Sequence, residues 1–179
     1  MTGATLLLTP ELHAALWGHL LPKESRREQA AFLFCDTTCH DGRLTFSAID
    51  AAFLQPADFA AQHSDYIELT DACRIGLIKR AHALGAALAE FHSHPGPWPA
   101  AFSLSDRSGL SETVPHMRWR LGGRPYLAVV VAPSGFDALV WPDSAKRPEA
   151  LAGIRVGPDL HLPTNASLGG WDDDIARPV

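Results

Sequence analysis

The chain has 179 residues, of which 46% are hydrophobic and 20% are charged, a composition typical of one soluble globular domain with a sizeable core. Its formal net charge of −5 argues against a general nucleic-acid-binding surface and is compatible with a basic partner. The three cysteines, Cys35, Cys39 and Cys73, are too few and odd in number for a disulfide framework, which favours a reducing compartment.

The N-terminus and the apolar runs bear on localisation. Residues 1–8 contain no basic region and too short an apolar run for a signal peptide. No apolar stretch approaches the roughly 20 residues that are needed to span a bilayer. We therefore expect a cytoplasmic protein that binds neither a membrane nor nucleic acid.

Periodicity and capping residues predict the elements of the chain. The strands are expected at residues 4–8, 28–35, 44–46, 49–54, 86–91, 126–131, 136–141 and 154–162. The helices are expected at residues 10–21, 71–84 and 103–114, with N-caps at Thr9 and Thr70 and a C-cap at Gly85. Residues 55–64 are expected to form a loop, and the polar stretch 144–152 predicts no definite element. One domain should cover residues 1–163, followed by an acidic, loosely held tail at 164–179.

Residues 35–42 allow two interpretations. Cys35, Cys39 and His40 are potential metal ligands, but no fourth ligand follows at a helpful spacing. Asp41-Gly42 is a strong signal for the tight turn of a β-hairpin. The hairpin is the favoured interpretation.

The most informative stretch runs from residue 90 to residue 106. In a strand, His92 and His94 project from the same face, roughly 6.6 Å apart. Pro95 then ends the strand, and a Pro/Gly-rich loop leads to Ser103 and Asp106. Two imidazoles, one carboxylate and an open fourth position are typical of a catalytic zinc site.

His92-x-His94-Pro95 followed by Ser103-x-x-Asp106 resembles the signature of the JAMM (MPN-plus, or JAB) zinc metalloproteases. Eight residues separate His94 from Ser103, one more than is usual in that family. The family also uses a glutamate on an earlier strand, in a segment such as Glu-x-x-Gly-Leu-Leu-Leu-Gly.

The segment that begins at Glu28 (EQAAFLFC) has the shape of this glutamate motif, with Ala31 and Cys35 where glycines are commoner. The resemblance covers about residues 5–142. It implies an α/β fold of the MPN (JAB/MPN-like, cytidine-deaminase-like) type, in which a curved, mixed, mostly antiparallel β-sheet is flanked by helices.

The resemblance also implies the site and its chemistry. His92, His94 and Asp106 would bind Zn²⁺, Glu28 would transfer the proton of the attacking water, and Ser103 would stabilise the developing oxyanion. The implied activity is that of an isopeptidase or peptidase. It would cut after the C-terminal tail of a ubiquitin-like protein, to remove that protein from a target or to process its precursor.

The short chain is similar to the stand-alone prokaryotic members of the family. Those members occur beside activating-type or conjugating-type enzymes, in pathways that include antiviral conjugation and sulfur transfer. Two other functions stay open at this point. They are a zinc peptidase that acts on small peptides or adducts, and a non-catalytic MPN scaffold, against which the intact ligand set argues.

Two further residues near the motif have open roles. Strand parity places Glu90 on the face of His92 and His94, where we expect a structural or supporting role instead of coordination. Trp98 lies between two prolines in the loop. It belongs either to a rigid turn or to a substrate-contacting surface.

Overall fold

The computed structural model describes residues 3–143 and 147–171. The strands are β1 (Ala4–Leu8), β2 (Ala30–His40), β3 (Arg43–Phe53), β4 (Phe59–Gln62), β5 (Ile67–Leu69), β6 (Ala87–Ser93), β7 (Tyr126–Ala132), β8 (Gly135–Trp141), β9 (Glu149–Val156) and β10 (Asp159–His161). The helices are α1 (Pro10–Leu20), α2 (Asp71–Leu84) and α3 (Leu104–Arg120), with short 3₁₀ turns η1 (Pro56–Asp58) and η2 (Leu168–Gly170). Within this part of the chain, no helix has the length and apolar character needed to cross a membrane.

The main sheet is closed. Seven strands follow one another in the order β1-β3-β2-β6-β7-β8-β9, and β1 pairs in parallel with both β3 and β9. The predicted MPN-type fold, a curved sheet flanked by helices, is therefore wrong, because the sheet closes into a seven-stranded barrel. The closing pair joins strands from opposite ends of the chain, and no local sequence pattern encodes such a pairing.

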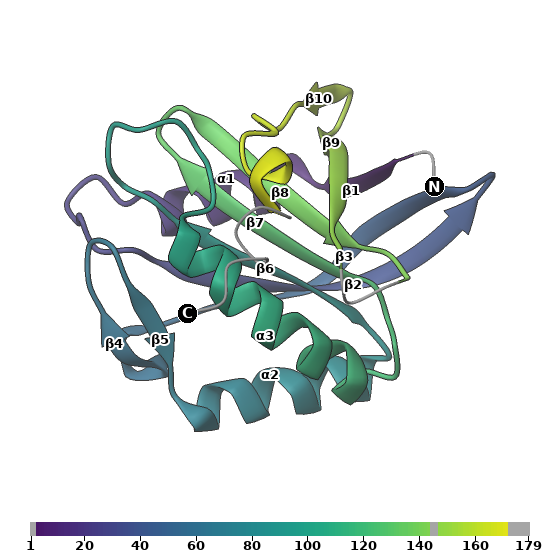
Figure 1. The fold of residues 1–179 in the computed structure, drawn as a ribbon, viewed down its shortest axis with the longest axis horizontal. Coiled ribbons are helices and arrows are strands. Elements are labelled where there is room, and N and C mark those ends of the chain that lie inside the picture. Colours follow the sequence, from purple (N-terminus) through teal and green to yellow (C-terminus); the bar gives the residue numbers. More distant parts are fainter. Residues whose placement is uncertain (1–2, 144–146, 172–179) are drawn as a thin grey trace.

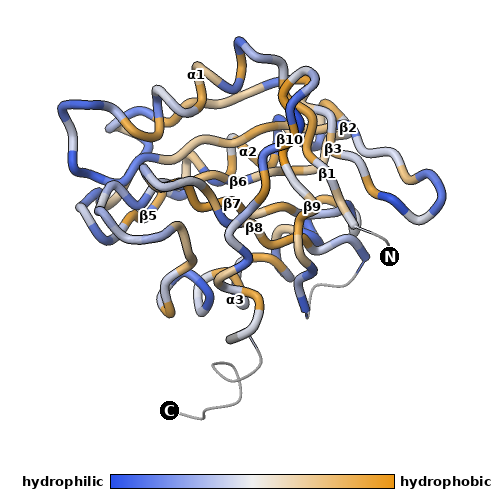
Figure 2. Tube along the Cα trace, turned by 90° about the horizontal axis from the view of Figure 1, so that it is seen from above, coloured by the Kyte–Doolittle hydropathy of each residue, from blue (hydrophilic) through white to orange (hydrophobic). Residues whose placement is uncertain are grey.

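Alternate strand residues build two apolar layers, one on each side of the barrel wall. The interior collects inward-facing residues from all seven strands, together with Leu16 and Leu20 of α1. The outer face of β2, β6, β7 and β8 is covered by α2 and α3, which lie on the opposite side of the wall from α1 (Figure 1). The central strands are accordingly hydrophobic, whereas the tip of the β2–β3 hairpin is hydrophilic (Figure 2).

The predicted caps at Thr9, Thr70 and Gly85 and the predicted hairpin turn are confirmed. The side chains of Thr9 and Thr70 cap α1 and α2 by accepting hydrogen bonds from backbone N–H groups three residues later. Gly85 ends α2 with φ = 65°, a conformation that glycine adopts without strain. Asp41 (φ = 49°) and Gly42 (φ = 73°) form the turn between β2 and β3, as the Asp-Gly pair predicts.

The cysteines near this turn do not form a metal site. Cys35 lies fully buried in the barrel interior, and Cys39 is exposed farther along β2. Burial raises the pKa of the Cys35 thiol to about 12, so this thiol stays protonated and is a poor ligand.

Several element boundaries differ from the prediction. The two short strands expected at 44–46 and 49–54 are one strand, β3, whose pairing with β2 shifts register between Phe34 and Cys35. The loop expected at 55–64 contains η1 and β4, and β4 forms a hairpin with β5. The strand expected at 154–162 is the antiparallel pair β9–β10.

Helix α3 is longer than predicted because its C-terminal half is anchored. It continues past Pro115 to Arg120, although a proline inside a helix costs about 3 kcal/mol. The buried Arg118 guanidinium donates hydrogen bonds to the carbonyl oxygens of Gly123 and Trp141, and Val114 is fully buried in the outer layer. These contacts offset the energetic cost of the proline in the helix.

The described part of the predicted tail packs against the barrel. The buried Asp137 carboxylate on β8 accepts hydrogen bonds from the backbone N–H groups of Asn165 and Ser167 and from the Ser167 hydroxyl. Trp171 is 3% exposed and packs against Trp141. Residues 172–179 of the predicted tail and residues 144–146 lie outside the described residues.

Side-chain truncations in β1, the strand that closes the barrel, test whether the sheet is closed. Leu6 is fully buried, whereas Leu7, its neighbour on the opposite face of β1, is 36% exposed. We expect Leu6→Ala to lower the free energy of unfolding by about 2–5 kcal/mol through cavity formation, and Leu7→Ala to lower it by less than about 1 kcal/mol. Urea unfolding measures both. Equal effects of the two variants would contradict the closed arrangement.

Candidate metal centre

Strand β6 positions the two histidines. His92 lies opposite Ala30 of β2 on one side and Val130 of β7 on the other. Its side chain points out of the barrel toward the start of α3, where its ring packs against Phe102. The backbone N–H of His94 donates to the Val131 carbonyl at 2.8 Å, so pairing with the neighbouring strand continues past the end of β6 and orients the second imidazole.

The first turn of α3 positions the carboxylate. The Ser103 hydroxyl accepts from the backbone N–H of Asp106 at 3.1 Å, and Asp106 Oδ2 accepts from the backbone N–H of Ser103 at 2.7 Å. This capping box holds the helix start. It also fixes the Asp106 side chain at the N-terminal end of the helix, where the dipole favours a negative charge.

Three potential ligand atoms meet at this point. His92 Nε2 and His94 Nε2 lie 3.2 Å apart, and Asp106 Oδ2 lies 3.5 Å from the first and 3.2 Å from the second. Ligands arranged tetrahedrally, about 2.0–2.1 Å from an ion, are about 3.3–3.4 Å from one another. The three distances therefore fit one face of a tetrahedral metal site. Among residues 3–143 and 147–171, this is the group of His, Cys, Asp or Glu side chains able to hold a metal ion.

Glu28 lies beside these ligands, just before β2. Its carboxylate is buried, and Oε1 lies 3.6 Å from His94 Nε2. The backbone is held by the β4–β5 hairpin, because Glu28 N–H donates to the His63 carbonyl at 2.8 Å and the Gln62 amide donates to the Glu28 carbonyl at 2.9 Å. The structure thus brings the predicted glutamate to the predicted ligands.

Ser93 links the two segments, a role that sequence analysis missed. Strand parity turns its side chain away from the histidines, which by itself indicates only packing. In the structure the fully buried Ser93 hydroxyl accepts from Gln29 N–H at 2.9 Å, and Ser93 N–H donates to the Gln29 carbonyl at 3.0 Å. This pair of hydrogen bonds fixes Glu28 relative to the histidines.

The ionisation of the site reflects strong coupling between its members. Burial opposes the charge on Asp106, but hydrogen bonds with His92 and His94 outweigh it and lower the pKa of this carboxyl. Burial likewise opposes the protonated form of His92, yet Asp106 raises the pKa of this imidazole overall. A bound cation would take the place of the proton that these groups share, so metal binding should release protons.

Burial raises the pKa of Glu28, and the nearby His92 and His94 oppose this shift only in part. Such a carboxylate holds protons more strongly than an exposed glutamate does. It is therefore better suited to accept a proton near neutral pH.

The loop between His94 and Ser103 flanks the site and is tied to the C-terminal segment. Phe102 N–H donates to the Ser167 hydroxyl at 2.7 Å, and the Thr164 hydroxyl donates to the Ala100 carbonyl at 2.7 Å. Trp98, at the tip, is 75% exposed. The larger spacing between the two motifs is thus accommodated by an ordered loop with an exposed aromatic side chain.

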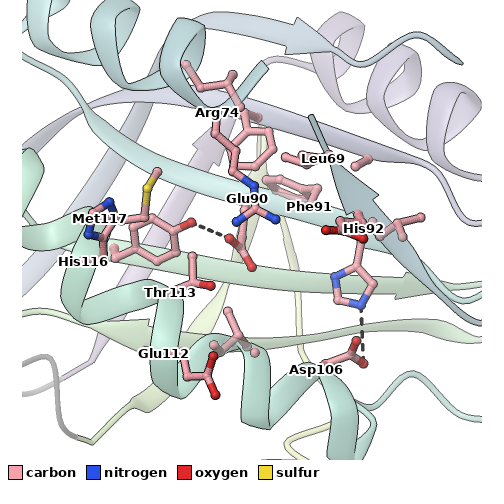
Figure 3. Close-up of a pocket in the computed structure, with 18 of the residues that line it drawn as sticks. Leu69, Arg74, Glu90, Phe91, His92, Asp106, Glu112, Thr113, His116 and Met117 are labelled. Carbon is pink, nitrogen blue, oxygen red and sulfur yellow. Dashed lines mark hydrogen bonds and ion pairs between the residues drawn. The ribbon is translucent and has the colours of Figure 1, made fainter. Parts of the chain in front are cut away.

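A cavity of about 710 Å³ extends from His92 and Asp106 into the space between α2, α3 and β5. Glu90 points into it, and the Tyr126 hydroxyl donates a hydrogen bond to Glu90 Oε2 (Figure 3). Burial raises the pKa of Glu90. Strand parity correctly placed this residue on the histidine face, but no sequence pattern indicates the cavity.

Comparison with known proteins gives no match, either to the models of protein families or to the curated sequences. The function proposed below therefore rests on the geometry of the site and on the motif resemblance.

Metal titration tests the ligand set. We expect the wild-type chain to bind about one divalent ion, and saturation at a hundredfold excess over Kd to raise its unfolding free energy by about 2.7 kcal/mol. His94→Ala and Asp106→Asn should abolish this gain. Asparagine keeps an oxygen to accept from Ser103 N–H, so the helix cap survives.

His82→Ala serves as the matched control, because it removes an exposed imidazole from α2. Thermal unfolding with Zn²⁺, Mn²⁺ and Ni²⁺, combined with measured metal content, gives the readout. A His94→Ala protein that binds metal as the wild type does would contradict this ligand set.

Removal of the Ser93 hydroxyl tests the link to Glu28. Because Gln29 N–H would lose its acceptor, Ser93→Ala should lower the unfolding free energy by about 1–3 kcal/mol. Metal content should stay at the wild-type level, because the ligands remain. Ser105→Ala, an exposed change in the first turn of α3, should have little effect on stability. Unchanged stability of Ser93→Ala would show that the link is dispensable.

Proposed function

We propose that this protein is a zinc-dependent hydrolase of amide bonds, with a JAMM-type set of functional residues. The observation that carries the proposal is the convergence of four groups from three separate segments. Glu28 precedes β2, His92 lies near the end of β6 and His94 directly follows it, and Asp106 lies in the first turn of α3. Their functional atoms lie 3.2–3.6 Å from their nearest neighbours in the site.

Zinc suits the donor set. Two imidazole nitrogens and one carboxylate oxygen in tetrahedral positions are ligands that zinc commonly takes at catalytic sites, with the fourth position open. When bound, the ion would polarise a carbonyl group and lower the pKa of a coordinated water to about 7.

Glu28 is proposed as the general base and acid. Its carboxylate is held beside the ligands by the β4–β5 hairpin and by the Ser93–Gln29 link. It would accept a proton from the attacking water and then return it to the leaving amine, which is a poor leaving group until it is protonated. Its presence at the site argues against the non-catalytic scaffold.

We propose two roles for Ser103, one before the substrate binds and one during the reaction. Its hydroxyl donates to Asp106 Oδ2 at 2.7 Å, so in the resting protein it orients a ligand. The oxyanion role implied by the motif requires this hydroxyl to rotate toward the substrate, where its proton would stabilise the developing negative charge.

For the substrate, we propose the C-terminal tail of a ubiquitin-like protein, either joined to a target or extended in a precursor. The support is the motif resemblance, together with the exposed Trp98 beside the site. Activating-type or conjugating-type enzymes would supply such conjugates. Hydrolysis of small peptides is the second candidate, and the cavity next to the ligands favours it.

The Glu28→Gln variant tests the proposal. We expect kcat to fall by about 10²–10⁴-fold, because the variant cannot accept the proton, while zinc content stays unchanged. The assay compares a ubiquitin-like protein that carries a C-terminal extension with short peptides of the same sequence, before and after removal of the metal by chelation.

Glu24→Gln is the control, since it neutralises an exposed glutamate that is not one of the candidate ligands. Undiminished turnover by Glu28→Gln, or turnover that survives complete removal of metal, would overturn the mechanism. Preference for the intact protein over the peptide would favour the first substrate class.

A further inference from the structure

The cavity beside the metal ligands has a position suited to a substrate side chain. It is continuous with the site, since both His92 and Asp106 line it, and it extends to Tyr126 and Met117. Glu90 lies two residues before His92 on the same face of β6, so its Cα is about 6.6 Å away from that of His92. A substrate residue whose backbone lies at the ligands can therefore reach Glu90 only with a long side chain.

The lining of the cavity is acidic. Apart from Asp106, five carboxylates line it, and the cationic side chain that opposes them is Arg74. The five are Asp65, Glu68, Asp71, Glu90 and Glu112. A ligand with a negative charge would be repelled by this arrangement, whereas a positive charge would be attracted, most strongly where solvent screens least.

Glu90 is the carboxylate placed farthest from bulk solvent. Tyr126 donates to Oε2 and thereby fixes the rotamer, and the carboxylate is turned into the cavity (Figure 3). Arg74 extends toward it from α2 (Figure 3) and acts on it through its positive charge, although the two side chains form no ion pair within the described residues. With Oε2 bonded to Tyr126, the other carboxylate oxygen of Glu90 can accept a hydrogen bond from a ligand in the cavity.

Much of the remaining wall is apolar, although Ser105, Thr113 and His116 also line the cavity. Phe32, Leu77, Leu110 and Met117 line the cavity and belong to the buried layer between the barrel and the two helices. Such walls fit an aliphatic stem, while Glu90 meets the charged end. Long side chains that combine these two properties are those of lysine and arginine.

We propose that this cavity is a specificity pocket for a lysine or arginine side chain of the substrate next to the cleaved amide. The assignment of this side chain to the residue next to the cleaved bond rests on the proposed function. The recognition of a cation on an aliphatic stem by Glu90 is inferred from the cavity alone. Glu90 is thus a substrate-binding residue instead of a metal ligand.

Binding of three peptides tests the pocket. They are acetylated, amidated pentapeptides of alanine with lysine, norleucine or glutamate at the centre. Calorimetric titration uses the Zn²⁺-loaded Glu28→Gln protein, so that no peptide is consumed. The lysine peptide should bind about tenfold or more tightly than the norleucine peptide, and the glutamate peptide should bind more weakly than either. An arginine peptide should resemble the lysine peptide.

Glu90→Gln, added to this protein, should reduce the lysine preference to about twofold. Glutamine keeps an oxygen to accept from Tyr126, and unchanged thermal unfolding and zinc content would show that the site is intact. Glu112→Gln, which changes an exposed carboxylate of α3 that also lines the cavity, should keep most of the preference, because a more exposed carboxylate contributes less.

Equal binding of the lysine and norleucine peptides by the protein with Glu90 would overturn the pocket, as would preference for glutamate. Wild-type turnover separates this result from the proposed function. Peptide hydrolysis without a preference for basic residues would support the proposed hydrolase and contradict the specificity pocket. Glu90-dependent binding of the lysine peptide without hydrolysis would support the pocket and contradict the hydrolase.

Discussion

The position of β6 between β2 and β7 is the constraint on which the site depends. Its register turns Phe91 into the barrel interior and His92 outward to the helices. Because strand side chains alternate, a shift of one residue would exchange the two faces and dismantle the ligand set. The apolar layers on both sides of the wall oppose such a shift. Packing of the barrel and geometry of the ligands are thus set by the same pairings.

The start of α3 serves structure and chemistry at once. A Ser-x-x-Asp sequence at a helix start is commonly no more than a capping box, and Ser103 and Asp106 do form one. The same Asp106 oxygen that accepts from Ser103 also faces both imidazoles. The structural and functional interpretations of this motif are therefore compatible. The cap limits the freedom of a carboxylate that would otherwise lose more conformational entropy on binding an ion.

Local chemistry made part of the structure predictable. Thr9, Thr70 and Gly85 act within one turn of the chain, and the Asp41-Gly42 pair specifies a tight turn by itself, so these features follow from sequence. The pairing of His92 with His94 follows from strand parity, and their meeting with Glu28 and Asp106 was expected from motif order alone.

The missed features depend on contacts between distant segments. Closure of the barrel, continuation of α3 past Pro115 and packing of residues 164–171 are each stabilised by partners far along the chain. The Ser93–Gln29 link is of the same kind, since a buried serine has no local signature that separates packing from hydrogen bonding. The cavity at Glu90 is a property of the space between two helices and a hairpin, which no single segment defines.

Closure of the barrel by β1 and β9 also bears on how the molecule forms. All four residues of the candidate site precede β9 in the chain, so they leave the ribosome before the strand that closes the barrel. Contacts of such long sequence separation slow folding, because loop entropy must be lost before the pairing compensates for it. The Phe102–Ser167 hydrogen bond adds a second late contact, directly beside the start of α3. The hydrogen bond that supports the loop beside the ligands therefore depends on a residue that leaves the ribosome after all of them.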